Sequence, residues 1–247
     1  MKLWAIGDLH LCISVPKKSM EFFGTPWIGY IKKIEENWKK YIQDEDIVLV
    51  PGDISWALKW EDALVDLKWI DCLPGKKIMI RGNHDYWWGS LTKMAKDLPS
   101  SIILLQNNSI TIGDISIGGS RLWDTVEFTY APYIEFQENP HGKNKEESIQ
   151  KDLSEKIFER ELIRLELSLN SMKKNATRKI IMTHYPPIGP YLQASRASNI
   201  LESFGIEICV FGHLHHLRKN VSLFGEKNGV RYLLAASDYL DFIPLQL

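Results

Sequence analysis

The sequence predicts an α/β protein, and two observations carry this prediction. Short apolar runs typical of strands recur along the chain, and helical patterns separate the early runs. Each run is apolar throughout and ends in glycine or polar residues, which indicates strands covered on both faces. The runs span 2–8, 46–53, 76–83, 178–184 and 206–213.

Helices are predicted between the first three strands, over 31–42 and 60–73. The second begins with Glu61 and Asp62, and the helix dipole favours negative charge in a first turn. Strand and helix therefore alternate in the first third of the chain, as in a βαβ arrangement.

The middle and the end of the chain follow other patterns. Residues 102–118 alternate apolar and polar positions around two turn-forming pairs, so they predict antiparallel hairpin strands. Residues 146–174 predict one long amphipathic helix whose charges form a solvated face. Residues 230–247 predict a closing strand and a tail.

Composition bounds the class of protein. A chain of 247 residues, 45% hydrophobic, can bury its core in a single domain over 1–247. Thirty basic and 31 acidic residues leave no global positive field to attract long nucleic acid or an anionic membrane. Three cysteines far apart in sequence favour reduced thiols and a cytoplasmic location. Neither a signal peptide nor a long apolar span is expected.

Polar side chains able to bind a metal gather where the predicted strands end. In an open α/β sheet the carboxyl ends of the strands converge on one crevice, so residues distant in sequence are expected to meet there. One histidine at a strand end is more often structural than a ligand, and only the whole set favours a metal site. The set is Asp8, His10, Asp53, Asn83, His84, His184, His213 and His215.

The spacing and the chemistry of these residues favour two metal ions. The pairs Asp8/His10 and His213/His215 are two residues apart, so in an extended backbone both members face the same side. Carboxylate, imidazole and amide ligands without thiolate suit Mn²⁺, Fe²⁺ or Zn²⁺, and Mn²⁺ is favoured here. Two ions need a bridging carboxylate, for which Asp53 is the natural candidate.

With these residues in place, the sequence resembles a calcineurin-like metallophosphoesterase. Five motifs of that family occur in order: D-x-H at 8–10, G-D at 52–53, G-N-H-D at 82–85, a lone histidine at 184 and G-H-x-H at 212–215. The resemblance implies a sandwich of two mixed β-sheets flanked by helices. It also implies one metal on Asp8, His10, Asp53 and His215, and a second on Asp53, Asn83, His184 and His213.

The resemblance further implies how a phosphate ester is cleaved. A hydroxide held between the metals attacks phosphorus, and His84 assists the leaving oxygen. Asp85 either orients His84 or caps the following turn, and both alternatives stay open. Protein phosphatases of the superfamily carry an acidic residue and an arginine soon after the G-D pair, and this chain has neither. Hydrolases of UDP-diacylglucosamine usually carry arginine where this chain has His84. The closest resemblance is therefore to compact prokaryotic phosphohydrolases.

Several functions compete at this stage. A small phosphodiester, with a nucleotide among the candidates, is favoured because no basic cluster stands ready for a dianionic terminal phosphate. A phosphomonoesterase and a nuclease acting on short nucleic acid are the alternatives. A non-catalytic scaffold is disfavoured because every motif position is filled. No membrane partner is expected, and the sequence does not fix the oligomeric state.

Nine tryptophans predict a further feature of the site. Trp27 and Trp123 lie in the segments 12–30 and 120–143, which we expect to form a partial lid that stacks on the substrate. The alternative is ordinary packing. Arg121 is a weak candidate for a phosphate contact, and Arg81 for a surface ion pair. His216 and His141 are expected to lie outside the ligand set.

Overall fold

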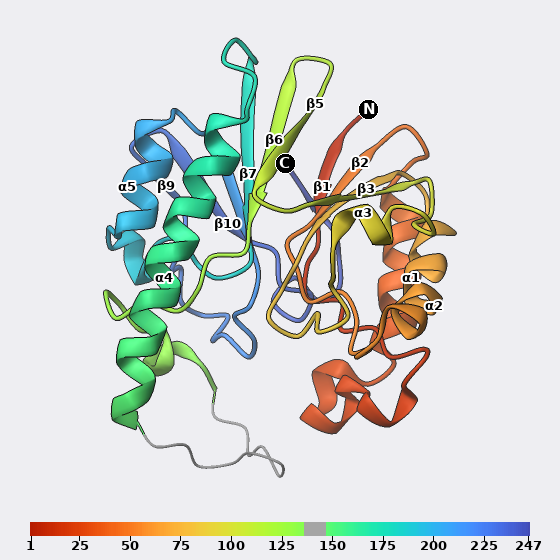
Figure 1. Cartoon of the computed structure of the whole chain (residues 1–247). Helices are drawn as coiled ribbons and strands as arrows, with labels where there is room; N and C mark the ends of the chain where they lie inside the picture. Colours follow the sequence, from red (N-terminus) through yellow and green to blue (C-terminus); the bar gives the residue numbers. More distant parts are fainter. Residues whose placement is uncertain (136–146) are drawn as a thin grey trace.

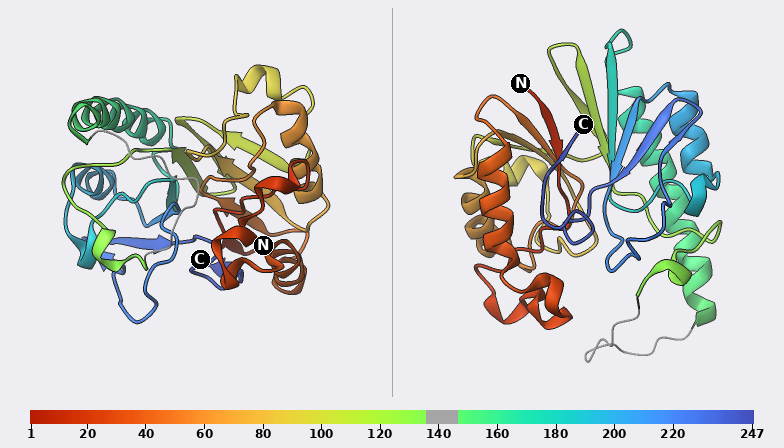
Figure 2. Two further views of the ribbon diagram at one scale, coloured as in Figure 1. Left: turned by 90° about the horizontal axis from the view of Figure 1, so that it is seen from below. Right: turned by 180° about the vertical axis from the view of Figure 1, so that it is seen from behind.

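The chain folds into four layers. A computed structural model describes residues 1–135 and 147–247, with side chains described from residue 153 onward in the helix that begins at residue 147. Two β-sheets pack face to face and helices cover the outer face of each, as Figure 1 and the view from below in Figure 2 show. The sandwich of two mixed sheets flanked by helices is thereby confirmed.

The first sheet has the strand order β11-β1-β2-β3-β4. Its strands β1 to β4 are mutually parallel, and β11 pairs antiparallel with β1. The bounds are β1 Leu3–Ala5, β2 Ile47–Val50, β3 Lys76–Ile80, β4 Ile102–Leu105 and β11 Leu245–Gln246. These strands are rich in Ile, Val and Leu because both of their faces are covered.

The second sheet has the order β5-β6-β7-β8-β10-β9, in which β6, β7, β8 and β10 are parallel and the two outer strands are antiparallel. Its bounds are β5 Asn108–Ile112, β6 Ile115–Ser120, β7 Arg178–Thr183, β8 Ile208–Phe211, β9 Glu226–Lys227 and β10 Val230–Leu234. The parallel strands of both sheets run toward the lower end of Figure 1, so their carboxyl ends meet there.

Helices α1 and α2 cover the first sheet, and α4 and α5 cover the second (Figure 1). Helix α1 buries Tyr30, Ile34 and Trp38, which are four residues apart and so lie on one face. A reciprocal capping box between Ser195 and Ser198 starts α5. The bounds are α1 Tyr30–Tyr41, α2 Trp60–Asp71, α3 Leu91–Met94, α4 Glu147–Asn170 and α5 Arg196–Ser203.

Short 3-10 helices occupy the connections. Three of them, η1 Pro16–Lys18, η2 Met20–Phe23 and η3 Thr25–Trp27, lie at the lower end of the sandwich in Figure 1. The other two are η4 Ala131–Tyr133 and η5 Pro190–Leu192. Among the described helices, none is both long and apolar enough to cross a bilayer.

Apolar side chains fill three contiguous layers. One lies between the first sheet and its helices, and another between the second sheet and its helices. The third lies between the two sheets, where Leu49 and Ile78 meet Ile117, Ile180 and other aliphatic side chains. Burying one such side chain stabilises the fold by about 1.5–3 kcal/mol, so the interlayer contacts hold the carboxyl ends of both sheets at one edge.

The expected hairpin over 102–118 is partly wrong. Residues 108–120 do form an antiparallel hairpin, but 102–105 pair parallel with β3 at the edge of the other sheet. The chain therefore crosses between sheets at Gln106 and Asn107, and Asn107 has the left-handed φ of 61° that such a turn requires. Alternation of apolar residues does not reveal which partner a strand takes. The three cysteines are free, as expected.

Candidate metal centre

All seven sequence-predicted ligands lie beyond strand ends at the edge where the two sheets meet. Strand β1 stops at Ala5 and β8 at Phe211, so the ligands that follow them occupy loops. The expected extended geometry of these pairs is wrong, because Asp8, His10 and His213 have φ values of 53°, 44° and 72°. The backbone turns after each strand, so Asp8 and His10 both approach His215, whereas His213 approaches Asn83 instead.

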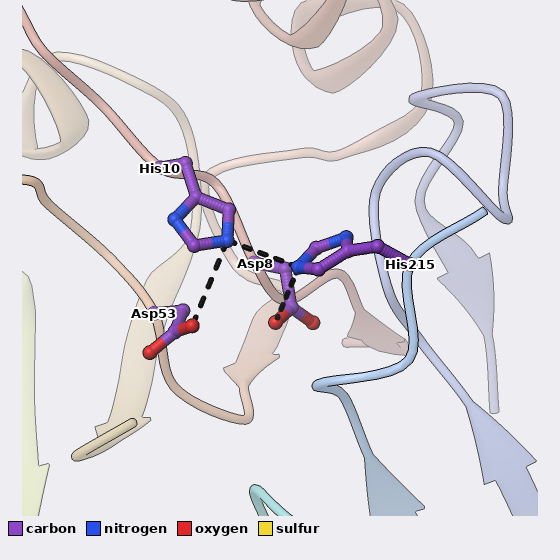
Figure 3. A group of neighbouring side chains, drawn as sticks. All are labelled: Asp8, His10, Asp53 and His215. Carbon is purple, nitrogen blue, oxygen red and sulfur yellow. Dashed lines mark hydrogen bonds and ion pairs between the residues drawn. The ribbon is translucent and has the colours of Figure 1, made fainter. Parts of the chain in front are cut away.

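A first group of ligands comes together around Asp8 (Figure 3). One ligand atom from each of its four residues lies within 4.8 Å of the others, the arrangement of a group that could hold a metal ion. Nε2 of His10 lies 3.1 Å from Nε2 of His215 and 3.6 Å from Oδ2 of Asp53. Nε2 of His215 lies 3.6 Å from Oδ1 of Asp8.

A second group gathers around Asn83. The Oδ1 atom of Asn83 lies 2.6 Å from Nε2 of His184 and 3.0 Å from Nδ1 of His213. Nε2 of His184 in turn lies 3.6 Å from Oδ1 of Asp53. The two histidines that are two residues apart in sequence, His213 and His215, thus belong to different groups.

Asp53 lies between the two groups, with one carboxylate oxygen directed at each. Its Oδ1 atom accepts a hydrogen bond from the backbone N–H of His84 at 2.9 Å, whereas Oδ2 is buried and has no hydrogen-bond partner among the described residues. Buried carboxylate oxygens are normally satisfied. A divalent cation would satisfy Oδ2, so the donor set fits metal ions on both sides of Asp53.

Two glycines of the motifs allow the carboxylates to approach the backbone. A Cβ added at Gly82 would collide with the carboxylate of Asp53, and one at Gly212 would collide with that of Asp8. The backbone N–H of His213 donates to Oδ1 and Oδ2 of Asp8 at 3.0 and 3.1 Å. Glycine is therefore required for space at both positions.

Burial favours the neutral form of three of the four ligand imidazoles, those of His10, His184 and His213. Burial lowers the pKa of His10 and His213 well below the ordinary value, and lowers that of His184 to about 3. Burial also raises the pKa values of Asp8 and Asp53. Metal ligation requires neutral imidazole and ionised carboxylate, so cations would favour the carboxylate charge that burial disfavours.

Two histidines are oriented by oxygen acceptors on the side away from the other ligands. Nδ1 of His184 lies 2.9 Å from the carbonyl oxygen of Pro51, and Nδ1 of His215 lies 2.9 Å from Oδ1 of Asp238. Burial lowers the pKa of His215, but Asp238 and then Asp8 and Asp53 outweigh this effect and raise it to about 9. Such partners fix the ring and its tautomer.

Asp238 is a functional residue that sequence reasoning missed. It is buried and also accepts a hydrogen bond from the backbone N–H of His216 at 2.9 Å. The loop after β10 that carries Asp238 lies beside the first strand, since Ser237 bonds to Gly7. Its segment was expected to be a closing tail, and no motif marks it. His216 belongs to neither of the two groups described above, and His141 falls outside the described residues.

His84 is half-buried beside the first ligand group, among aromatic neighbours. Its ring centroid lies 4.5 Å from Trp56, 5.6 Å from His10 and 6.3 Å from Tyr86. Its Nδ1 atom is buried without a hydrogen-bond partner among the described residues. Burial lowers the pKa of His84, although Asp53 acts in the opposite direction.

Asp85 does not orient His84. Its Oδ1 atom accepts hydrogen bonds from the backbone N–H groups of Ile54 and Ser55 and from Nε1 of Trp87, and its Oδ2 atom accepts one from the N–H of Gly82. These four donors satisfy both carboxylate oxygens, so the alternative in which Asp85 orients His84 is wrong. Asp85 instead ties the loop after β2 to the loop after β3.

The two lid tryptophans have different positions. Trp27 is fully buried and packs edge-on against His10 and His215, with ring centroids 6.1 and 5.6 Å apart. Trp27 packs against the ligand histidines from the buried side, so its expected role in a lid is wrong. Trp123 lines an open cavity beside His213. The part of the expected lid from 136 to 143 lies outside the described residues.

Comparisons with known proteins identify the family of the chain and proteins of similar fold. The profile described as calcineurin-like phosphoesterase matches residues 1–217, a span that includes all seven ligands. Among curated proteins, none matches the chain. A phosphopantetheinyl hydrolase from Mycobacterium tuberculosis has a similar fold, with a TM-score of 0.61, 14% identity, and coverage of 100% of this chain and 95% of that one.

A protein of unknown function from Aquifex aeolicus is also similar, with a TM-score of 0.49, 17% identity, and coverage of 99% and 95% of the two chains. The profile match and the Asp–His cluster support metal-dependent hydrolysis of a phosphate ester. Because that profile covers most of its length, the chain belongs to the calcineurin-like phosphoesterase family.

Proposed function

We propose that the protein is a phosphoesterase that uses two divalent metal ions and prefers phosphodiesters. The observation that carries this proposal is the placement of Asp53, whose two oxygens each lie 3.6 Å from an imidazole of a different ligand group. One ion is assigned to Asp8, His10, Asp53 and His215, and the other to Asp53, Asn83, His184 and His213.

The ions, of which Mn²⁺ is favoured over Fe²⁺ and Zn²⁺, supply an activated water and neutralise the phosphoryl oxygens when they are bound. The protein supplies the rest. Asn83 offers a neutral oxygen, so it completes the ligand set without a further negative charge facing the phosphate. Asp238 and the carbonyl oxygen of Pro51 hold two imidazoles in a fixed orientation.

His84 is proposed to assist the departure of the leaving group. Its ring is positioned by Trp56 and lies 5.6 Å from that of His10, so it borders the ligands without belonging to them. In its protonated form it would donate a proton to the leaving oxygen, and general acids of this kind typically contribute about 10² to 10⁴ in rate. Asp85, whose hydrogen bonds all go elsewhere, is assigned a positioning role in the two loops and no role in proton transfer.

An aromatic cavity of about 270 Å³ supports an apolar or aromatic group on the substrate. Trp123, Phe128, Tyr130 and Pro186 line it, and the ligand His213 forms part of its wall. A ring bound in this cavity therefore lies next to the metal centre. A nucleobase or another flat apolar group fits this chemistry.

A preference for diesters is supported by the charge of the ligand groups. Within the described residues, no lysine ammonium or arginine guanidinium makes a hydrogen bond or ion pair to the seven ligands. A monoanionic diester needs less positive charge than a dianionic monoester. Hydrolysis of monoesters and cleavage of short nucleic acids are the competing activities.

Three free thiols favour a reducing compartment, the cytoplasm.

Turnover by the metal-loaded protein tests the proposal. Protein reconstituted with Mn²⁺ should hydrolyse bis(p-nitrophenyl) phosphate faster than p-nitrophenyl phosphate. The His84→Ala variant should bind Mn²⁺ normally and turn over about 10² to 10⁴ more slowly. Faster cleavage of the monoester would contradict the diester preference, and an unchanged rate in His84→Ala would remove His84 from the mechanism. Steeply salt-dependent binding of polynucleotide would instead favour the nuclease.

A further inference from the structure

A second cavity lies at the carboxyl ends of β3, β4 and β6, where these strands face α4. It measures about 50 Å³, more than the roughly 30 Å³ that one water occupies in the liquid. We call it the arginine pocket. Its polar lining includes Arg81, Gln106, Ser120, Arg121, Glu161 and Arg164.

Two polar groups of the arginine pocket are buried without partners. Ser120 is only 2% exposed, and its Oγ atom makes no hydrogen bond to the described residues. Nε of Arg81 is also buried and unpartnered, and Arg81 forms no ion pair with any described residue. Buried hydroxyl and guanidinium groups rarely lack partners in folded proteins, so a ligand or ordered solvent is required here.

The charge in the arginine pocket favours an anion. Glu161 is the single carboxylate in its lining and is buried at 1% exposure. Its Oε1 atom already accepts from Arg164 at 2.6 Å and lies 3.5 Å from Arg121. Three guanidinium groups against one carboxylate leave a net positive charge in a partly buried place. Guanidinium groups bind phosphate oxygens through paired N–H donors.

The amide side chain of Gln106 also presents a donor. The side-chain oxygen of Gln106 accepts a hydrogen bond from Nε1 of Trp88 at 3.1 Å, which leaves the amide N–H₂ free to donate. Besides Glu161 and the amide side chain of Asn107, the pocket therefore presents hydrogen-bond donors: guanidinium groups, the amide of Gln106 and a hydroxyl.

The arginine pocket borders the metal centre. Arg81 lies two residues before Asn83, and the carbonyl oxygen of Arg121 accepts hydrogen bonds from the backbone N–H groups of His184 and Tyr185 at 3.0 Å. The guanidinium of Arg121 also lies 4.6 Å from the ring centroid of Trp123, which lines the aromatic cavity. One substrate could therefore extend from the metal centre into both cavities.

We infer that the arginine pocket binds a second phosphate group of the substrate, remote from the phosphate that is hydrolysed. This inference rests on the proposed function and names the substrate class more closely, as a phosphodiester that carries an additional phosphate. The sequence predicted a phosphate contact for Arg121 and a surface ion pair for Arg81. It did not predict that the two arginines line the same pocket.

Kinetics of matched variants test the inference. The Mn²⁺-loaded protein is assayed on bis(p-nitrophenyl) phosphate and on the p-nitrophenyl ester of thymidine 5′-phosphate with and without a 3′-phosphate. The 3′-phosphate should lower KM about tenfold, and Arg81→Met should abolish that advantage with kcat unchanged. The control is Arg160→Met, because Arg160 contacts Glu161 at 3.4 Å but does not line the pocket. An equal decrease in kcat/KM on all three substrates in Arg81→Met would overturn the inference. So would an equal KM of the wild type for the esters with and without the 3′-phosphate.

A measurement without turnover separates this inference from the proposed function. Crystals of the wild type soaked in tungstate should show anomalous scattering in the arginine pocket, and crystals of Arg81→Met should not. An empty arginine pocket in the wild type contradicts the inference whether or not the enzyme is active. Failure of the proposed function would appear separately, as absent hydrolysis of all three esters while tungstate still occupies the pocket.

Discussion

Nδ1 of His215 lies 2.9 Å from Oδ1 of Asp238, a residue that the chain supplies from the loop after β10. The same carboxylate accepts a hydrogen bond from the backbone N–H of His216. Asp238 therefore fixes both the ring of His215 and the loop that carries it. An oriented imidazole binds a metal more tightly than a rotating one because less freedom is lost on binding.

Replacing Asp238 should weaken metal binding without unfolding the protein. In Asp238→Ala the affinity for Mn²⁺ is expected to fall about 10- to 100-fold, because the imidazole of His215 loses its acceptor. Asp238→Asn keeps an acceptor oxygen and should lose less. Isothermal titration with Mn²⁺ measures both values. Wild-type affinity in the alanine variant would show that Asp238 does not position His215.

Asp85 should prove structural. Its carboxylate accepts four hydrogen bonds, three of them from backbone N–H groups, so Asp85→Ala leaves buried donors unpaired. Each lost bond to a charged group costs about 1.5–3 kcal/mol, and we expect a loss of at least about 3 kcal/mol in the free energy of unfolding. Urea denaturation gives this value. A stable Asp85→Ala protein with lost turnover would instead place Asp85 in the chemistry.

The two tryptophans of the expected lid should respond differently. Trp123 lines the aromatic cavity, and stacking on an aromatic ring contributes about 1–3 kcal/mol. Trp123→Ala should therefore raise KM for bis(p-nitrophenyl) phosphate by roughly 5- to 150-fold, and Trp123→Phe, which keeps a flat ring, should recover most of it. Steady-state kinetics decide this. An unchanged KM in the alanine variant would count against a substrate ring in that cavity.

Trp27→Ala should act on stability. The side chain is fully buried and packs against Tyr30 and Phe242 as well as two ligand histidines. Large-to-small changes of this kind cost about 3–5 kcal/mol in unfolding free energy. Urea denaturation of the metal-free protein isolates the effect from metal binding. A decrease of less than about 1 kcal/mol in the unfolding free energy would mean that Trp27 does not support the packing of the site.

Lys77 should make stability depend on pH. Burial lowers its pKa from the ordinary value of 10.5 to about 8, although Asp71 acts in the opposite direction. Below pH 8 the ammonium is charged in both states and its burial penalty is fully present. Between pH 8 and 10.5 the folded protein releases the proton that the unfolded chain keeps, so this residue's contribution to unfolding free energy rises with pH.

The matched variant for this effect is Lys77→Met, which keeps the length of the side chain and removes the charge. Urea denaturation of both metal-free proteins from pH 7.5 to 10.5 gives the difference in unfolding free energy at each pH. The unfolding free energy of the wild type should rise relative to that of Lys77→Met as the pH rises. A difference that is constant over this range would contradict a lowered pKa for Lys77.

The candidate site could be predicted from the sequence because each of its ligands follows the end of a predicted strand. Continuous apolar runs mark buried parallel strands, and the first polar residue after each run must lie at the shared edge. Asp53 and His184, 131 residues apart, follow strands of the two different sheets, and they come within 3.6 Å because the carboxyl ends of both sheets lie at the same edge. The sandwich itself followed from the family resemblance, since apolar alternation does not show which sheet a strand joins.

Other features depend on contacts that no local pattern encodes. Asp238 sits in the loop after β10, and its role appears only because that loop packs beside β1 and faces His215. The arginine pocket joins residues from β3, β6 and α4 that share no motif. The backbone turns at Asp8, His10 and His213 were also missed, because a left-handed φ in a non-glycine residue is set by the tight loop it closes.

Electron paramagnetic resonance of the Mn²⁺-loaded protein measures whether Asp53 joins two metal ions. Titration should saturate at two Mn²⁺ per chain and give the spectrum of a spin-coupled pair. In Asp53→Asn the coupling should disappear. Saturation at a single ion, or two ions with the spectrum of isolated Mn²⁺, would show that Asp53 does not bridge a metal pair.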